Sequence, residues 1–114
     1  MDETKLTLLN TSILTSFGTY VYEPLTLEEA RALASEFEQK GKIIQSAIGH
    51  QTTADLLSGL LGLTVAVNRT EYKQAVNDVA LIFKLKGRPP EGKVLSREEL
   101  EEMGYEFGLL QRVA

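Results

Sequence analysis

One short stretch of the chain holds residue types that can bind an anion and move a proton. Residues 46–53 read Ser-Ala-Ile-Gly-His-Gln-Thr-Thr and include His50, the single histidine of the sequence. An imidazole can carry a proton and release it near neutral pH, which Lys and Arg do not do readily. Apolar residues at helical spacing follow His50, and the free N–H groups of a helix start favour a bound phosphate. We therefore expect Gly49, Gln51 and Thr52 to contact a phosphate-bearing ligand beside this histidine.

A structural role for His50 is the alternative to a chemical one. On position alone, a histidine at a helix start is more often a cap or a partly buried polar residue than a catalytic group. The position therefore predicts where a helix begins and leaves both roles open.

A second group of charged residues lies in the short loop 87–93, which reads Gly-Arg-Pro-Pro-Glu-Gly-Lys. Two prolines restrict its backbone, so Arg88 and Glu91 would be held in place at low entropic cost. Lys84, Lys86 and Arg88 also alternate along the end of a predicted strand. Such a row of cations either forms a solvated sheet edge or lines a groove for phosphates.

Three further polar residues form a third group. Asn10 and Ser12 follow the first predicted strand, and ligands of open α/β sheets usually dock at the carboxyl ends of the strands, so both are candidates for a pocket. Arg69, which follows a β-branched run at residues 64–67, is a further candidate. For Asn10 and Ser12 the alternative is an ordinary turn built from turn-forming residues.

The pattern of apolar and polar residues predicts the elements that position these candidates. Strands are expected at residues 5–10, 43–48, 79–85 and 105–113. Two capping boxes predict helices from residue 27 to a stop at 40–41 and from residue 97 to 103. A third helix is expected between His50 and a stop at Gly62. Residues 13–22 fit a loop or a short hairpin that runs to a break at Glu23-Pro24.

Length and composition limit the possible functions. A chain of 114 residues forms one domain that can bury a core without disulfides. It has no cysteine and one histidine, so we expect no metal or other cofactor and no cysteine nucleophile. A net charge of −4 argues against binding long DNA. The acidic start and the lack of a long apolar segment predict a cytoplasmic protein without a membrane partner.

Taken in order, five segments resemble the viral and prophage ring nucleases, the anti-CRISPR enzymes that destroy cyclic tetra-adenylate. They are Leu8-Leu9-Asn10, residues 46–50, the threonine-rich helix start, Val67-Asn68-Arg69, and residues 88–95. The resemblance implies a compact α/β domain over residues 1–114, with a mixed β-sheet flanked by helices, that forms a homodimer. Gln51 and Pro89 depart from the family, which usually has an acidic residue after the histidine and an aliphatic residue after the arginine.

The resemblance also implies a role for each candidate. The family's catalytic residues fall on His50, Arg88 and Glu91, and its further ligand contacts on Asn10, Ser12 and Arg69. In the implied reaction a ribose 2′-OH attacks the neighbouring phosphorus without a metal, which gives linear di-adenylates with 2′,3′-cyclic phosphate ends. His50 would protonate the departing oxygen and Arg88 would hold the phosphoryl oxygens. Glu91 would orient one of these two residues or accept the 2′ proton.

Two other classes of function compete with a nuclease. A module that sequesters a cyclic nucleotide, or that contacts another protein, would keep the pocket and lack the chemistry. A small DNA-binding regulator would need a basic face and a recognition helix, and the two helices around Thr26 and His50 supply neither. A ring nuclease that serves a virus, a prophage or a cell regulating its own defence is therefore the first expectation, and a sequestering or protein-interaction module is the second.

Overall fold

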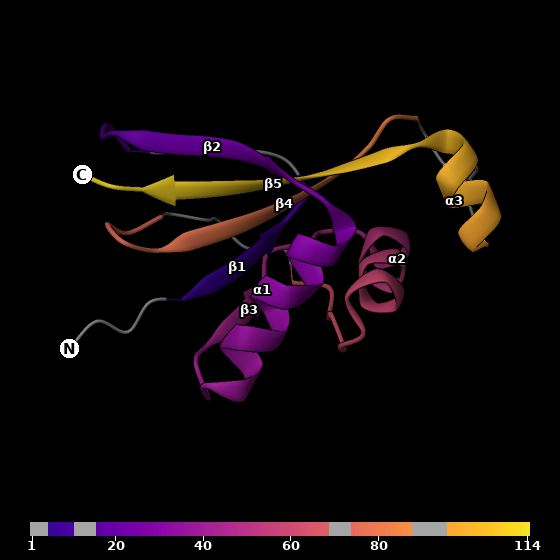
Figure 1. The fold of residues 1–114 in the computed structure, drawn as a ribbon, viewed down its shortest axis with the longest axis horizontal. Coiled ribbons are helices and arrows are strands. Elements are labelled where there is room, and N and C mark those ends of the chain that lie inside the picture. Colours follow the sequence, from indigo (N-terminus) through magenta and orange to yellow (C-terminus); the bar gives the residue numbers. More distant parts are fainter. Residues whose placement is uncertain (1–4, 11–15, 69–73, 88–95) are drawn as a thin grey trace.

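The computed structural model describes residues 5–10, 16–68, 74–87 and 96–114, which form a five-stranded sheet and three helices (Figure 1). Its elements are β1 (Leu6–Leu9), β2 (Tyr20–Leu25), α1 (Leu27–Gln39), β3 (Ile44–Ser46), α2 (Gln51–Leu61), β4 (Val79–Leu85), α3 (Arg97–Met103) and β5 (Tyr105–Arg112). Among these ranges, no helix is both long and apolar enough to cross a membrane.

The sheet is mixed, as expected, and has the strand order β2-β5-β4-β1-β3. β1 pairs in parallel with β3 on one side and with β4 on the other, whereas β5 pairs antiparallel with β4 and with β2. All of β1 and the first five residues of β4 are buried, which suits strands that are covered on both faces. Parallel pairing also turns the carboxyl ends of β1, β3 and β4 toward the same edge of the sheet.

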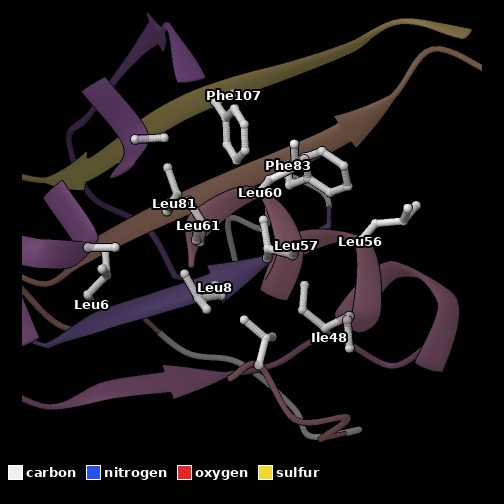
Figure 2. Close-up of a cluster of buried hydrophobic side chains, with 14 of the residues drawn as sticks. Leu6, Leu8, Ile48, Leu56, Leu57, Leu60, Leu61, Leu81, Phe83 and Phe107 are labelled. Atoms are coloured by element: carbon white, nitrogen blue, oxygen red, sulfur yellow. The ribbon is translucent and has the colours of Figure 1, made fainter. Parts of the chain in front are cut away.

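The side-chain alternation predicted for β4 is confirmed. Leu81 and Phe83 face the helices and belong to the main core, which includes Leu57 and Leu60 of α2 (Figure 2). The intervening side chains face the other side of the sheet and belong to a smaller cluster of Leu9, Ala80, Ile82 and Leu110. The leucines of α2 therefore fix this helix against the sheet, and with it the position of His50.

Both predicted capping boxes are present. At the start of α1, Glu29 N–H donates to Thr26 Oγ1 at 3.1 Å, and Thr26 N–H donates to Glu29 Oε1 at 2.9 Å. The same exchange joins Ser96 and Glu99 at the start of α3. α2 ends at Gly62, whose φ of 72° is a left-handed conformation that suits glycine.

One expectation for the strands is wrong. The segment before α1 does not break at Glu23-Pro24, because β2 runs through both residues and pairs with β5 in the far part of the chain. β2 is an outer strand, so Pro24 can lack an N–H group on the side that has no neighbouring strand. Residues 64–68 follow α2 without forming a strand, although Val65 is buried in the main core.

Candidate functional site

The candidate site lies at the carboxyl ends of the parallel strands, where ligands dock in open α/β sheets. The register places Leu8 of β1 opposite Ser46 of β3, and Leu9 of β1 opposite Ile82 of β4. Asn10 follows β1 directly and is half-buried, while the segment that leads to His50 follows β3. The structure thus brings the segments of these two predicted residues to one edge of the sheet.

Hydrogen bonds hold the backbone that leads to His50. Ala47 N–H donates to the carbonyl of Leu8 at 3.0 Å, which ties this segment to the end of β1. Ile48 N–H donates to Ser46 Oγ at 3.2 Å. Asn68 then closes the segment from the other side, because its side chain donates to the Ser46 carbonyl at 2.7 Å and its N–H donates to the Ile48 carbonyl at 2.8 Å.

His50 is the N-cap residue of α2, with an extended backbone at φ −127° and ψ 132°. Its carbonyl accepts the first helical hydrogen bond, from Ala54 N–H at 3.0 Å, but its side chain makes no capping hydrogen bond. The imidazole is exposed to solvent. The cap interpretation is therefore correct for the backbone of His50 and does not account for its side chain.

The start of α2 differs from the starts of the other two described helices. The first turns of α1 and α3 each carry two glutamates, whereas the first turn of α2 carries no acidic residue. Acidic side chains at a helix start offset the partial positive charge of its N–H groups. The N-terminus of α2 therefore keeps that partial charge, which favours an anion such as a phosphate.

The side chains of the predicted phosphate contacts around His50 differ in their surroundings. Gln51 is exposed, and its amide donates to Asp55 Oδ1 one turn along α2 at 2.7 Å. Thr52 and Gly49 are half-buried. The Gln51 amide has two N–H groups, so it can hold Asp55 with one and still donate to a ligand with the other. Thr52 lies in the first turn of α2.

Four predicted site residues lie outside the described part of the chain, namely Ser12, Arg69, Arg88 and Glu91. The structure does place the first two members of the cation row that Arg88 would complete. Lys84 is half-buried on the face of the sheet opposite the helices, and its Nζ lies 5.8 Å from the ring centroid of Tyr22. β4 ends at Leu85, and Lys86 is exposed beyond it.

A hollow of about 640 Å³ lies elsewhere, at the amino end of β3, and is lined by Glu38, Gly41, Lys42, Ile44, Leu63 and Thr64. Lys42 points its ammonium at the ring of Phe37, with 5.4 Å from Nζ to the ring centroid. This hollow is at the opposite end of β3 from Ser46, so it is separate from the candidate site.

Asn68 is the residue of this site that the sequence interpretation did not assign. In the sequence it stands between a β-branched run and Arg69. Its two hydrogen bonds to residues 46–48 depend on how residues 64–68 lie against β3, and a sequence without partners does not fix that register. An amide side chain directly after a β-branched run was the available signal.

The family of the chain follows from a direct comparison. The model of the STIV B116-like family matches residues 6–107. The chain belongs to the STIV B116-like family. It is 34% identical to YddF of Bacillus subtilis over 109 residues, which cover 96% of this chain and 98% of YddF. It is 45% identical to ORF117 of Acidianus two-tailed virus over 84 residues, which cover 67% of this chain and 72% of ORF117.

Further comparisons extend this kinship. Protein 26 of Sulfolobus islandicus filamentous virus is 36% identical over 90 residues, which cover 78% of this chain and 72% of that protein. The solved structure of B116 from Sulfolobus turreted icosahedral virus matches with a TM-score of 0.83 at 29% identity, over 95% of this chain and 99% of that chain. The expected viral kinship and the α/β fold are therefore confirmed, in a family that spans archaeal viruses and a Bacillus protein.

Proposed function

We propose that this member of the STIV B116-like family is a ring nuclease that opens cyclic tetra-adenylate without a metal and thereby switches off type III CRISPR effectors. The observation that carries the proposal is the exposed imidazole of His50 at the start of α2, beside the carboxyl ends of β1 and β3. The kinship with proteins of archaeal viruses supports it. So does the first turn of α2, which carries no acidic residue and so favours phosphate.

The proposed reaction is an internal transesterification of the ring. A ribose 2′-oxygen bonds to the adjacent phosphorus while the bond from that phosphorus to the 5′-oxygen breaks. The leaving 5′-oxygen takes a proton from the His50 imidazolium, and the 2′-hydroxyl gives its proton to a base. The products carry a 2′,3′-cyclic phosphate and a 5′-hydroxyl, and the substrate supplies its own nucleophile. The protein must position the linkage and stabilise the phosphoryl charge.

The remaining roles follow from side-chain chemistry and from the resemblance. The guanidinium of Arg88 suits two phosphoryl oxygens at once because its donors form a planar fork. Glu91 would accept the 2′ proton or orient Arg88. The half-buried amide of Asn10 at the end of β1 would position the ligand, together with Ser12 and Arg69.

A homodimer is part of the proposal, because cyclic tetra-adenylate can adopt two-fold symmetry. A two-fold dimer would place one His50 at each of two opposite linkages, so that one histidine per subunit suffices. Cleavage at both linkages releases two linear di-adenylates. The dimer would also double the local cations around the phosphates, although each chain has a net charge of −4. A fully active monomer in sedimentation experiments would contradict this part of the proposal.

The test is incubation of the protein with labelled cyclic tetra-adenylate in excess chelator, followed by denaturation and identification of the product termini. We expect di-adenylates with 2′,3′-cyclic phosphate ends from the parent and a severe loss of rate for His50→Ala. Recovery of the intact ring from protein that had bound it would instead establish the sequestering module. Loss of the parent's activity in chelator would refute the metal-free reaction.

A further inference from the structure

We infer that Asn68 is a positioning residue that fixes His50 for proton transfer, an inference that rests on the proposed function. Asn68 makes two hydrogen bonds to the segment in front of His50. Its side-chain amide donates to the Ser46 carbonyl, and its backbone N–H donates to the Ile48 carbonyl. It therefore clasps residues 46–48 from the side opposite β1.

The clasp leaves little freedom to the peptide that carries the histidine. Between β1 and Asn68, each of the three residues 46–48 has a backbone group in a hydrogen bond, and the Ile48 side chain is fully buried. Ile48 is two residues before His50, so the clasp acts within one short stretch of backbone. On the far side of the histidine, Ala54 N–H binds the His50 carbonyl. The backbone on both sides of His50 is thus held by hydrogen bonds.

The segment that provides the clasp is itself anchored to α2. Val65 N–H donates to Ser58 Oγ at 2.8 Å, and the Ser58 hydroxyl donates to the Ala54 carbonyl at 2.8 Å within the helix. The clasp therefore links β3, the start of α2 and the segment that runs on to Arg69. Displacing a reacting group by about 1 Å can cost on the order of a hundredfold in rate.

The Asn68 side chain is exposed, so losing its hydrogen bond should leave the fold intact. The matched control is Gln45, on the same strand as Ser46. Its side-chain amide donates to Thr7 Oγ1 at 2.8 Å on the face of the sheet opposite the helices, away from His50. Asn68→Ala and Gln45→Ala each remove one exposed amide donor, and only the first bond belongs to the clasp.

We expect Asn68→Ala to lower the single-turnover rate on cyclic tetra-adenylate by roughly ten- to a hundredfold, with binding changed less than about threefold. Gln45→Ala should stay within about threefold of the parent in both the single-turnover rate and the affinity for the ring. In the His50→Ala background, adding Asn68→Ala should cause no further loss, because the residue acts through the imidazole. The inference would be overturned if Asn68→Ala bound the ring more weakly but cleaved it at an unchanged rate. It would also be overturned if Asn68→Ala lowered the rate by its full factor in the His50→Ala background.

A second measurement does not depend on nuclease activity. The chain has one histidine, so the imidazole resonances of His50 are unique in a nuclear magnetic resonance spectrum of the free protein. Asn68→Ala should shift or broaden these resonances, and Gln45→Ala should leave them unchanged. Unchanged resonances in Asn68→Ala would refute the positioning role of the Asn68 side chain. A parent that fails to cleave the ring would instead refute the proposed function, whatever the spectrum shows.

Discussion

Replacing His50 distinguishes a catalytic histidine from a helix cap. The His50 side chain is exposed and makes no capping hydrogen bond, so His50→Ala should change the free energy of unfolding by less than about 0.5 kcal/mol. A general acid contributes roughly 10²- to 10⁴-fold to a rate, or about 3–5 kcal/mol of barrier. The substitution should therefore remove most of the cleavage activity and almost none of the stability.

Thr26 provides the matched control, because it is an N-cap residue whose side chain does make the capping hydrogen bond. Thr26→Ala should cost about 1 kcal/mol of stability, or about 4–8 °C in Tm, and leave cleavage unchanged. His50→Asn should instead raise the stability and abolish cleavage. The asparagine can cap α2 and raise stability by about 1 kcal/mol, yet it cannot donate the proton.

The assays are urea denaturation and single-turnover cleavage of cyclic tetra-adenylate, carried out on the parent and the three variants. If His50→Ala lost as much stability as Thr26→Ala, the imidazole would be a structural cap after all. If His50→Asn cleaved at the rate of the parent, histidine would not be the acid. Either result would refute the reasoning from the geometry of α2.

Three further predictions concern the fold. Leu57→Ala should cost about 2–5 kcal/mol in urea denaturation, because this fully buried side chain of the main core would leave a cavity. Gly108→Ala should lower the free energy of unfolding by about 1–3 kcal/mol, because the added Cβ would lie 2.7 Å from Tyr22 Cζ. The same substitution should cost less in the Tyr22→Ala background, where the ring is absent. The hydrogen bond and the charge of Lys40 lower the pKa of Glu36, so carboxyl titration should show this pKa rising in Lys40→Met. The parent's extra stability from this pair is present above the ordinary pKa of Glu36 and lost as pH falls through the lowered value.

Local signals in the sequence were enough to locate most of the elements. The capping boxes at Thr26 and Ser96 mark the helix starts because each depends on residues three positions apart. The alternation in β4 revealed its two faces because successive side chains of a strand point to opposite sides. Gly62 marked the end of α2 because the chain turns there through a left-handed conformation.

Features that depend on distant partners could not be obtained this way. β2 looked like a broken loop because Glu23-Pro24 is unfavourable in a central strand, and only the pairing with β5 shows that it is an outer strand. The clasp of Asn68 requires residues 64–68 to lie against residues 46–48, which no local pattern specifies. In the candidate site, the position of His50 at a helix start was predictable, whereas the contacts that hold it there were not.

The acidic residues of this chain are distributed unevenly over the starts of its described helices. The chain has 16 acidic and 12 basic residues, and the described helices differ in where the acids fall. α1 and α3 place glutamates in their first turns, where these stabilise the helix start and repel anions. α2 has no acidic residue in its first turn, and its N-cap residue His50 makes no side-chain capping hydrogen bond. Its buried leucines hold it against the sheet. A helix that needed its N-terminus only for stability would gain from an acid or a capping side chain there, so their absence at His50 supports the phosphate site that we propose at this helix start.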